Sequence, residues 1–342
     1  MAHTTASFFL LFIALLCQAQ RPAAEQAQRA APAKAPPAGY EHYVAGSPAD
    51  AQTQTAGGLA LLGGGTDIDE AFRWMIRKSG GGDFVVIRAS GTDAYNGYIR
   101  KLGARDSVET FVLKDRAASA DAFVVARIRN AEALFIAGGD QWNYVSRWKG
   151  TPLAEAIQHL AARQAPIGGT SAGLAILGQF FFAAENGTVR SQEALADPYN
   201  RLVSVQRDFL ALPNMQGIIT DTHLGERDRM GRLVVFLARI VQDGWAAEAR
   251  GIGVDRETAV LVEPDGAATV VGKNPAYFLK LSHPPETCKP GAPLTARRIS
   301  VYRVTSGGKF DLRKWAGEGG TSYSFDVEAG VLKSTAPGGK IY

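Results

Sequence analysis

The feature of the sequence that most limits its fold is a regular alternation of short apolar runs with segments of helical periodicity. The apolar runs at residues 84–87, 109–113 and 133–136 are typical of strands that are buried on both faces. Amphipathic spacing at residues 67–82 and 121–131 predicts helices between them. Because strands alternate with helices, we expect an α/β fold with a mainly parallel sheet and right-handed crossovers.

The same alternation continues in the second half of the chain. Residues 217–223 are predicted to form a strand, and residues 229–242 form a clear amphipathic helix pattern. Residues 251–272 are expected to form a β-hairpin around a Pro-Asp-Gly turn. From about residue 274 the chain is rich in Pro and Gly, with one clear strand at 299–304. We expect this part to be an irregular extension of the same domain.

The N-terminal segment is typical of a secretory signal. The apolar run at residues 8–16 is too short to span a bilayer, and Cys17 and Ala19 are small residues suited to a cleavage site. The Ala-, Gln- and Pro-rich segment that follows cannot bury enough surface to become ordered. This interpretation divides the chain into a signal peptide at 1–19, a disordered linker at 20–39 and a single domain at 40–342.

We therefore expect the protein to be secreted or periplasmic. A lipoprotein anchor at Cys17 is less favoured, because Leu16 is larger than the residue that normally precedes such a cysteine. Cleavage after Ala19 would leave Cys288 as the only mature cysteine, so no internal disulfide is expected. Cys288 itself is interpreted as a small hydrophobic residue in a Pro-rich loop.

The charge distribution argues against a nucleic-acid partner. The net charge is +4, but the 37 Lys and Arg residues are spread among 33 carboxylates and form no block. No basic stripe is interleaved with aromatic residues. We expect neither nucleic-acid binding nor a membrane span.

Ser171 is the first candidate for chemistry. The segment PIGGTSAGLAIL at residues 166–177 places it in a Gly-x-Ser-x-Gly frame between a predicted strand and a predicted helix. Such a frame is typical of a nucleophile on a cramped turn, where neighbouring Cβ atoms would clash, and the amide of Ala172 could stabilise an oxyanion. The alternative interpretation is a small residue at a tight strand-to-helix junction.

A nucleophilic serine needs a base, and of the five histidines only His223 lies at a predicted strand end. The carboxyl ends of parallel strands meet at one edge of a sheet, so Asp140, Gln141 and Ser171 are expected near it. The base in turn needs an acid that orients it. The acids near His223 in sequence are Asp221, Glu193 and Glu226, and spacing does not choose among them.

Three arginines follow the histidine. On a helix Arg229 and Arg232 lie about 60° apart, whereas Arg227 lies far from Arg232, so the three do not form one stripe. The helix dipole disfavours Arg227 and Arg229 in a first turn, which indicates an anionic partner. That partner is either a carboxylate of the protein, such as Glu226 or Asp228, or a carboxylate of a substrate.

Together these motifs resemble those of cyanophycinases and their secreted relatives, which are serine peptidases of the aspartyl dipeptidase group. The resemblance extends from about residue 58 to 315, with the motifs in order. It implies a flavodoxin-like three-layer α/β/α fold of the class I glutamine amidotransferase type, with a C-terminal β-hairpin and extension. The motifs are GGGTD (63–67), FIAGGDQ (135–141), GGTSAG (168–173), SQEALADPY (191–199), DTHLGERDRMGRL (221–233) and GIGVDRETA (251–259).

The resemblance also implies a role for each candidate. Ser171 would be the nucleophile, His223 the general base and Glu193 the orienting acid. The implied oxyanion hole consists of the Gly139 and Ala172 amides. The residues implied to contact substrate are Asp140, Gln141, Asp221, Arg227, Arg229 and Arg232.

Cyanophycin is a polyaspartate that carries arginine on each side-chain carboxyl, and the family releases β-aspartyl-arginine dipeptides from it through an acyl-enzyme. The resemblance therefore implies a peptide as the substrate and implies no metal or cofactor. The sequence does not fix an oligomeric state, but relatives often dimerise, so the resemblance is compatible with a homodimer.

Two positions depart from the family pattern. Thr222 stands where cyanophycinases usually carry Gln, and Arg256 stands where an acid is common. We expect catalysis to survive both changes and the substrate to be cyanophycin or another β-aspartyl peptide. The alternative functions are an α/β-hydrolase-like esterase, which shares the Gly-x-Ser-x-Gly frame, and a non-catalytic binding module on the same scaffold.

Overall fold

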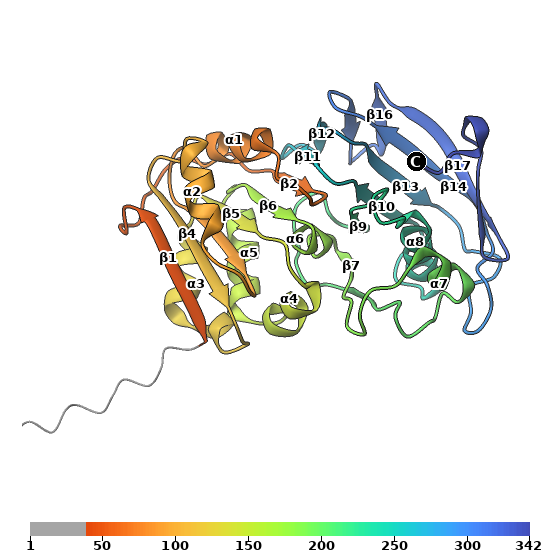
Figure 1. Ribbon diagram of the computed structural model, residues 1–342, viewed down its shortest axis with the longest axis horizontal. Coiled ribbons are helices and arrows are strands. Elements are labelled where there is room, and N and C mark those ends of the chain that lie inside the picture. The colour runs from red at the N-terminus through yellow and green to blue at the C-terminus, as the bar shows by residue number, and fades with distance from the viewer. Residues whose placement is uncertain (1–38) are drawn as a thin grey trace, which may run out of the picture. The chain divides into compact units, whose positions relative to one another are not determined.

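Strands that are apolar on both faces form the parallel centre of a ten-stranded sheet (Figure 1). The computed structural model describes residues 39–342, so the predicted signal peptide and residues 20–38 of the predicted linker lie outside the described residues. The strand order is β1-β4-β3-β5-β6-β2-β11-β12-β15-β16, and the strands from β4 to β2 are mutually parallel. The strands are β1 (Tyr40–Gly46), β2 (Leu59–Leu62), β3 (Phe84–Arg88), β4 (Ser107–Leu113), β5 (Ala133–Ile136), β6 (Ile167–Thr170), β11 (Thr258–Val262), β12 (Ala267–Gly272), β15 (Lys309–Asp311) and β16 (Ala316–Glu318).

Antiparallel strands extend this sheet on both sides, and a second mixed sheet stands beside it. In the second sheet β9 is parallel to β7 and β10, and the remaining pairs are antiparallel. The α/β class and the parallel core are confirmed, but the strands form two mixed sheets. The second sheet has the order β18 (Val331–Ser334), β17 (Thr321–Glu328), β14 (Ala296–Val304), β13 (Ala276–Leu281), β10 (Ala249–Val254), β9 (Ile218–Thr222), β7 (Phe180–Phe182) and β8 (Val205–Arg207).

Helices cover both faces of the first sheet and give the three-layer arrangement. In β2, Leu59 and Leu61 belong to one apolar cluster and Ala60 and Leu62 to another, because alternate side chains of a strand point to opposite faces. The first cluster includes residues of α3, α4 and α5, and the second includes residues of α1 and α2. The helices are α1 (Asp69–Lys78), α2 (Ala94–Lys101), α3 (Ala122–Asn130), α4 (Gln141–Trp148), α5 (Pro152–Ala162), α6 (Ala172–Ala175), α7 (Ser191–Ala196) and α8 (Met230–Gln242), with 3₁₀ turns at Ala118–Ala120 and Pro337–Gly339.

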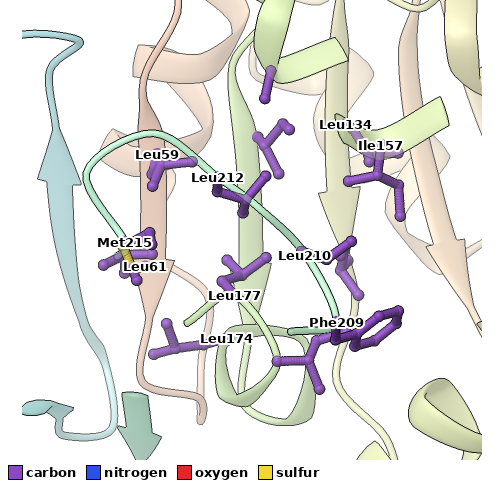
Figure 2. Close-up of a cluster of buried hydrophobic side chains, with 14 of the residues drawn as sticks. Leu59, Leu61, Leu134, Ile157, Leu174, Leu177, Phe209, Leu210, Leu212 and Met215 are labelled. Atoms are coloured by element: carbon purple, nitrogen blue, oxygen red, sulfur yellow. The ribbon is translucent and has the colours of Figure 1, made fainter. Parts of the chain in front are cut away.

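A loop also contributes to the core. Leu210, Leu212 and Met215 lie in the segment between β8 and β9 and are almost fully buried. Figure 2 shows these side chains in the same cluster as Leu59 and Leu61 of β2. The loop therefore closes the face of the sheet beside α5.

The part of the chain after residue 274 contributes strands to both sheets. Strand β13 pairs with β10, and β15 pairs with β12. A third apolar cluster joins α7 and α8 to this second sheet through residues such as Leu233 and Leu279. No helix among residues 39–342 combines the length and the apolar character that crossing a bilayer requires.

Gly173 in α6 offers a test of the close packing around this helix. A Cβ at Gly173 would lie 2.1 Å from the carbonyl oxygen of Ile136, so we expect Gly173→Ala to lower the free energy of unfolding by about 1–3 kcal/mol. Gly97 in α2 is the matched control, because a Cβ there meets nothing within 4 Å. Gly97→Ala should raise the free energy of unfolding by about 0.5–1 kcal/mol through helix propensity. Urea unfolding measures both, and a stabilised Gly173→Ala variant would contradict the packing argument.

Candidate active site

Ser171 occupies a strained turn between β6 and α6. Its backbone has φ +51° and ψ −118°, a combination that residues with a Cβ rarely adopt. Its N–H donates to the carbonyl of Leu62 at 3.1 Å, and its carbonyl accepts from the N–H of Ala175 at 3.0 Å. The turn is therefore held by the neighbouring strand and by the following helix, as expected for a nucleophile elbow.

The flanking glycines of the Gly-x-Ser-x-Gly frame are required by close backbone contacts. A Cβ at Gly169 would lie 2.6 Å from the backbone of Gly173, and a Cβ at Gly173 would lie 2.1 Å from the carbonyl oxygen of Ile136. Real Cβ atoms do not approach backbone this closely. The frame is thus a packing requirement of the turn that exposes Ser171.

His223 lies at the end of β9 and reaches Ser171 from the second sheet. Its Nε2 is 3.0 Å from the Ser171 Oγ. The backbone N–H of His223 donates to the carbonyl of Gly63 at 2.9 Å. A Cβ at Gly64 would lie only 2.3 Å from Nε2, so the bare backbone of Gly64 makes room for the ring. The structure brings the predicted nucleophile and base within hydrogen-bonding distance.

Glu226 is the carboxylate that contacts the histidine. Its Oε2 lies 2.5 Å from His223 Nδ1. A tight turn begins at His223, whose φ is +49°, and the Arg227 N–H donates to the His223 carbonyl at 3.0 Å, which keeps residues 223 and 226 close together. An ionised carboxylate only accepts, so Nδ1 carries the proton and Nε2 of the neutral ring is free to accept from Ser171.

The prediction that Glu193 orients the histidine is therefore wrong in this structure. Glu193 lies in α7, is exposed, and its Oε2 accepts from the backbone N–H of Arg190 at 2.9 Å. Its carboxylate caps the start of that helix. The signal that sequence reasoning did not use is the i, i+3 spacing of His223 and Glu226 directly after a strand.

The electrostatic environment keeps the histidine neutral. Burial lowers the pKa of His223 below its ordinary value, the hydrogen bond to Glu226 raises it, and the charges of Arg227 and Arg229 lower it further. The hydrogen bond with His223 lowers the pKa of Glu226 below the usual range of a carboxyl, so this group is ionised near neutral pH. This combination gives an unprotonated base and an anionic acid at physiological pH.

Of the two amides predicted for the oxyanion hole, that of Ala172 directly follows Ser171 in the chain. Ala172 is the first residue of α6, so its N–H has no acceptor within the helix. In the loop after β5, a Cβ at Gly138 would lie 3.5 Å from the Ser171 Cβ. Gly139 is the next residue of this loop and is exposed. Their joint role on an oxyanion stays a prediction.

Asp221 and Arg232 do not face a substrate, contrary to the prediction from resemblance. Each residue is 1% exposed. Arg232 donates from Nε to Asp221 Oδ2 at 2.8 Å and from Nη2 to Oδ1 at 2.5 Å. The guanidinium also lies over the rings of Phe182 and Phe236. The pair is a buried structural ion pair that joins α8 to β9.

Arg229 and Arg227 differ in their access to solvent. Arg229 is mostly buried, and its Nη1 donates to the carbonyl of Thr222 at 3.0 Å and to the Thr222 Oγ1 at 3.1 Å. Burial lowers the pKa of Arg229 to about 10. Arg227 is half exposed, and its Nε is 4.0 Å from Glu226 Oε2. Arg227 is thus the most accessible cation of the predicted arginines.

Asp140 and Gln141 lie at the start of α4, after β5. Asp140 is exposed, and its Oδ1 accepts from the Trp142 N–H at 2.9 Å, which caps the helix. The Gln141 side-chain amide donates to the carbonyl of Phe182 at 3.2 Å. Both residues follow the strand beside β6, so they lie at the predicted edge of the sheet. Within residues 39–342, no group of three or more His, Cys, Asp or Glu side chains is arranged to hold a metal ion.

Comparisons with known proteins identify the family of the chain. A family model described as peptidase family S51 matches residues 89–270. The chain is 30% identical over 223 residues to a cyanophycinase of Nostoc sp. (strain PCC 7120 / SAG 25.82 / UTEX 2576), covering 63% of this chain and 69% of the relative. It is 29% identical over 180 residues to a cyanophycinase of Synechococcus elongatus, covering 52% of this chain and 51% of that protein. A crystal structure of a peptidase from an acI-B1 Actinobacterium superposes with a TM-score of 0.51 at 15% identity, covering 76% of this chain and 98% of that one. This last likeness shows the fold.

The pKa of His223 predicts the pH dependence of Ser171 reactivity. Only the neutral ring can accept the serine proton, and burial holds its pKa below the ordinary value of 6.5. The rate at which a fluorophosphonate labels Ser171 should therefore rise with pH, reach half its maximum below pH 6.5 and stay flat above neutrality. Labelling rates measured from pH 4 to 9 test this, and a midpoint above pH 7 would contradict the assignment.

Glu226 and Glu193 form a matched pair of carboxylates for testing the acid. Glu226→Gln leaves the shape of the side chain but removes the anion that fixes the tautomer of His223, so we expect fluorophosphonate labelling to slow by about 10²-fold or more. Glu193→Gln should label within about twofold of the wild-type rate, because Glu193 contacts only the start of α7. An equal loss of labelling rate in both variants would contradict the assignment of Glu226 as the orienting acid.

Proposed function

The chain belongs to peptidase family S51 and is a serine-type peptidase, and on that premise we propose that it is a secreted exopeptidase. Its proposed reaction is the hydrolysis of cyanophycin, or of related β-aspartyl peptides, to dipeptides through an acyl-enzyme on Ser171. The observation that carries the proposal is the contact of Ser171 Oγ with His223 Nε2 at 3.0 Å, on a ring whose Nδ1 is 2.5 Å from Glu226. This array has the geometry of nucleophile, base and orienting acid.

In the proposed first step Ser171 Oγ attacks the scissile carbonyl while its proton passes to His223 Nε2. The imidazolium is stabilised by the Glu226 carboxylate, and it then gives the proton to the leaving amine. The developing oxyanion would be bound by the N–H groups of Ala172 and Gly139. In the second step His223 takes a proton from water, which attacks the ester, and then returns that proton to Ser171 Oγ as the dipeptide leaves.

The exposed charged residues near Ser171 and His223 favour a substrate that carries both a positive and a negative charge. Arg227 is half exposed beside the catalytic acid and could bind a carboxylate. Asp140 is exposed after β5, the strand that pairs with β6, and could bind a guanidinium. A β-aspartyl-arginine unit contains both groups. The relatives of Nostoc and Synechococcus are cyanophycinases, which favours this class of substrate.

Secretion is part of the proposal and rests on the N-terminal sequence. The apolar run at residues 8–16 precedes Cys17 and Ala19 in the order of a signal peptide. Residues 20–39 have the composition of a linker between such a signal and a folded domain. An extracellular or periplasmic peptidase would meet peptides released from other cells.

The decisive experiment is the cleavage of purified cyanophycin by the wild-type protein and by Ser171→Ala. We expect the wild type to release β-aspartyl-arginine and Ser171→Ala to lose at least about 10³-fold in kcat, because the nucleophile is absent. Mass spectrometry of a quenched reaction should find the acyl group on the peptide that contains Ser171. Full-length expression with assays of medium and cells would show where the activity resides.

Two controls separate the alternatives. A p-nitrophenyl ester that is cleaved while cyanophycin and other β-aspartyl peptides are untouched would indicate an esterase. Binding of these peptides without any cleavage would indicate a non-catalytic module. Either result would refute the proposed reaction.

A further inference from the structure

The catalytic carboxylate has a second partner that the proposed mechanism does not use. Glu226 Oε2 lies against His223, whereas Oε1 lies 3.3 Å from Arg256 Nη1. The Glu226 side chain is 31% exposed and sits in a surface turn. A long side chain in such a place loses rotamer freedom when it is held in one geometry, so a second contact can decide how often it points at the histidine.

A buried carboxylate ties the backbones of the two residues together. Asp255 Oδ1 accepts from the N–H of Glu226 at 3.2 Å and from the N–H of Arg256 at 2.8 Å. Asp255 is 9% exposed. A Cβ at Gly225 would lie 2.6 Å from Asp255 Oδ2, so the small residue lets the catalytic turn approach this carboxylate. The backbone positions from which the Glu226 and Arg256 side chains extend are therefore fixed relative to each other.

The guanidinium of Arg256 is itself held from the other side. Its Nη2 donates to Glu257 Oε1 at 3.0 Å. The backbone N–H of Glu257 donates to the carbonyl of Gly64 at 2.7 Å, and Gly64 is the residue against which the ring of His223 packs. One short turn between β10 and β11 thus supports the acid through Arg256 and the base through Gly64 (Figure 1).

We propose that Arg256 is a positioning residue that holds the Glu226 carboxylate in the orientation in which it accepts from His223 Nδ1. The inference rests on the proposed function, because it assigns a role within the same catalytic array. Arg256 bridges two carboxylates, Glu226 and Glu257, so it fixes one oxygen of Glu226 and leaves the other for the histidine. Its positive charge also contributes to the lowered pKa of Glu226, after the larger effect of the hydrogen bond with His223.

Arg256→Gln is the principal test, with kcat and KM measured on the peptide substrate and the labelling rate measured with a fluorophosphonate. We expect kcat and the labelling rate to fall about tenfold, with KM within about twofold, because the histidine is oriented less often and the substrate contacts remain. A tenfold loss corresponds to about 1.4 kcal/mol in the activation free energy. Arg256→Lys keeps the charge and should recover part of the loss.

Lys273→Gln is the matched control. Lys273 is a cation of the same surface region, its Nζ lies 2.9 Å from Glu257 Oε2, and its side chain is 73% exposed. This variant should keep wild-type rates. Urea unfolding of all three variants shows whether each is folded, and Arg256→Lys supplies the comparison if Arg256→Gln is unstable.

A double-mutant cycle separates positioning from a general structural effect. If Arg256 acts through Glu226, Arg256→Gln should cost nothing further in a Glu226→Gln background. An equal loss in both backgrounds would overturn the inference, as would wild-type labelling by Arg256→Gln or a raised KM at unchanged kcat. These outcomes differ from failure of the proposed function, in which the wild-type protein itself would neither label at Ser171 nor cleave peptides.

Discussion

The catalytic array depends on the junction of two β-sheets. Ser171 follows β6 of the first sheet, whereas His223 follows β9 of the second, and their contact crosses the boundary. One main-chain hydrogen bond fixes this crossing, and a second one holds its acceptor residue, Gly63, within the first sheet. The N–H of His223 donates to the carbonyl of Gly63, and the N–H of Gly63 donates to the carbonyl of Thr258 at the start of β11. The geometry of the site is therefore set by main-chain hydrogen bonds, which constrain position more tightly than flexible side chains do.

Beneath the junction lies the buried ion pair of Asp221 and Arg232. Burying two charges carries a desolvation penalty, which the attraction between them largely offsets, so the pair adds little net stability. Removing one partner would leave an uncompensated buried charge. Here the bidentate geometry and the rings of Phe182 and Phe236 complete the surroundings of the guanidinium. The pair joins α8 to β9, the strand that directly precedes His223. Its contribution to the site is orientation of β9.

The sequence predicts the elements whose signal is local and does not predict those that depend on distant pairing. The Gly-x-Ser-x-Gly frame and the position of His223 at a strand end are enough to expect the contact that the structure contains. The alternation of strands and helices predicts the parallel core. It does not reveal that β9 pairs with β10 in a second sheet, because strand pairing depends on residues far apart in the chain. The choice between Glu193 and Glu226 depends on one tight turn after β9, and the roles of Arg229 and Arg232 depend on burial.

Thr222 bears on how the proposed substrate would be recognised. In the family that the motifs resemble, this position usually carries Gln, whose amide would contact substrate. The Thr222 side chain is shorter and is 3% exposed, and its hydroxyl accepts from Arg229. Thr222 and Arg229 therefore satisfy each other inside the protein, and neither the hydroxyl nor this part of the guanidinium is free for a ligand. Discrimination among β-aspartyl peptides would then depend on the exposed charges of Arg227 and Asp140. Because exposed charges bind weakly and are screened by salt, such a site would select less strictly than one with a buried amide contact.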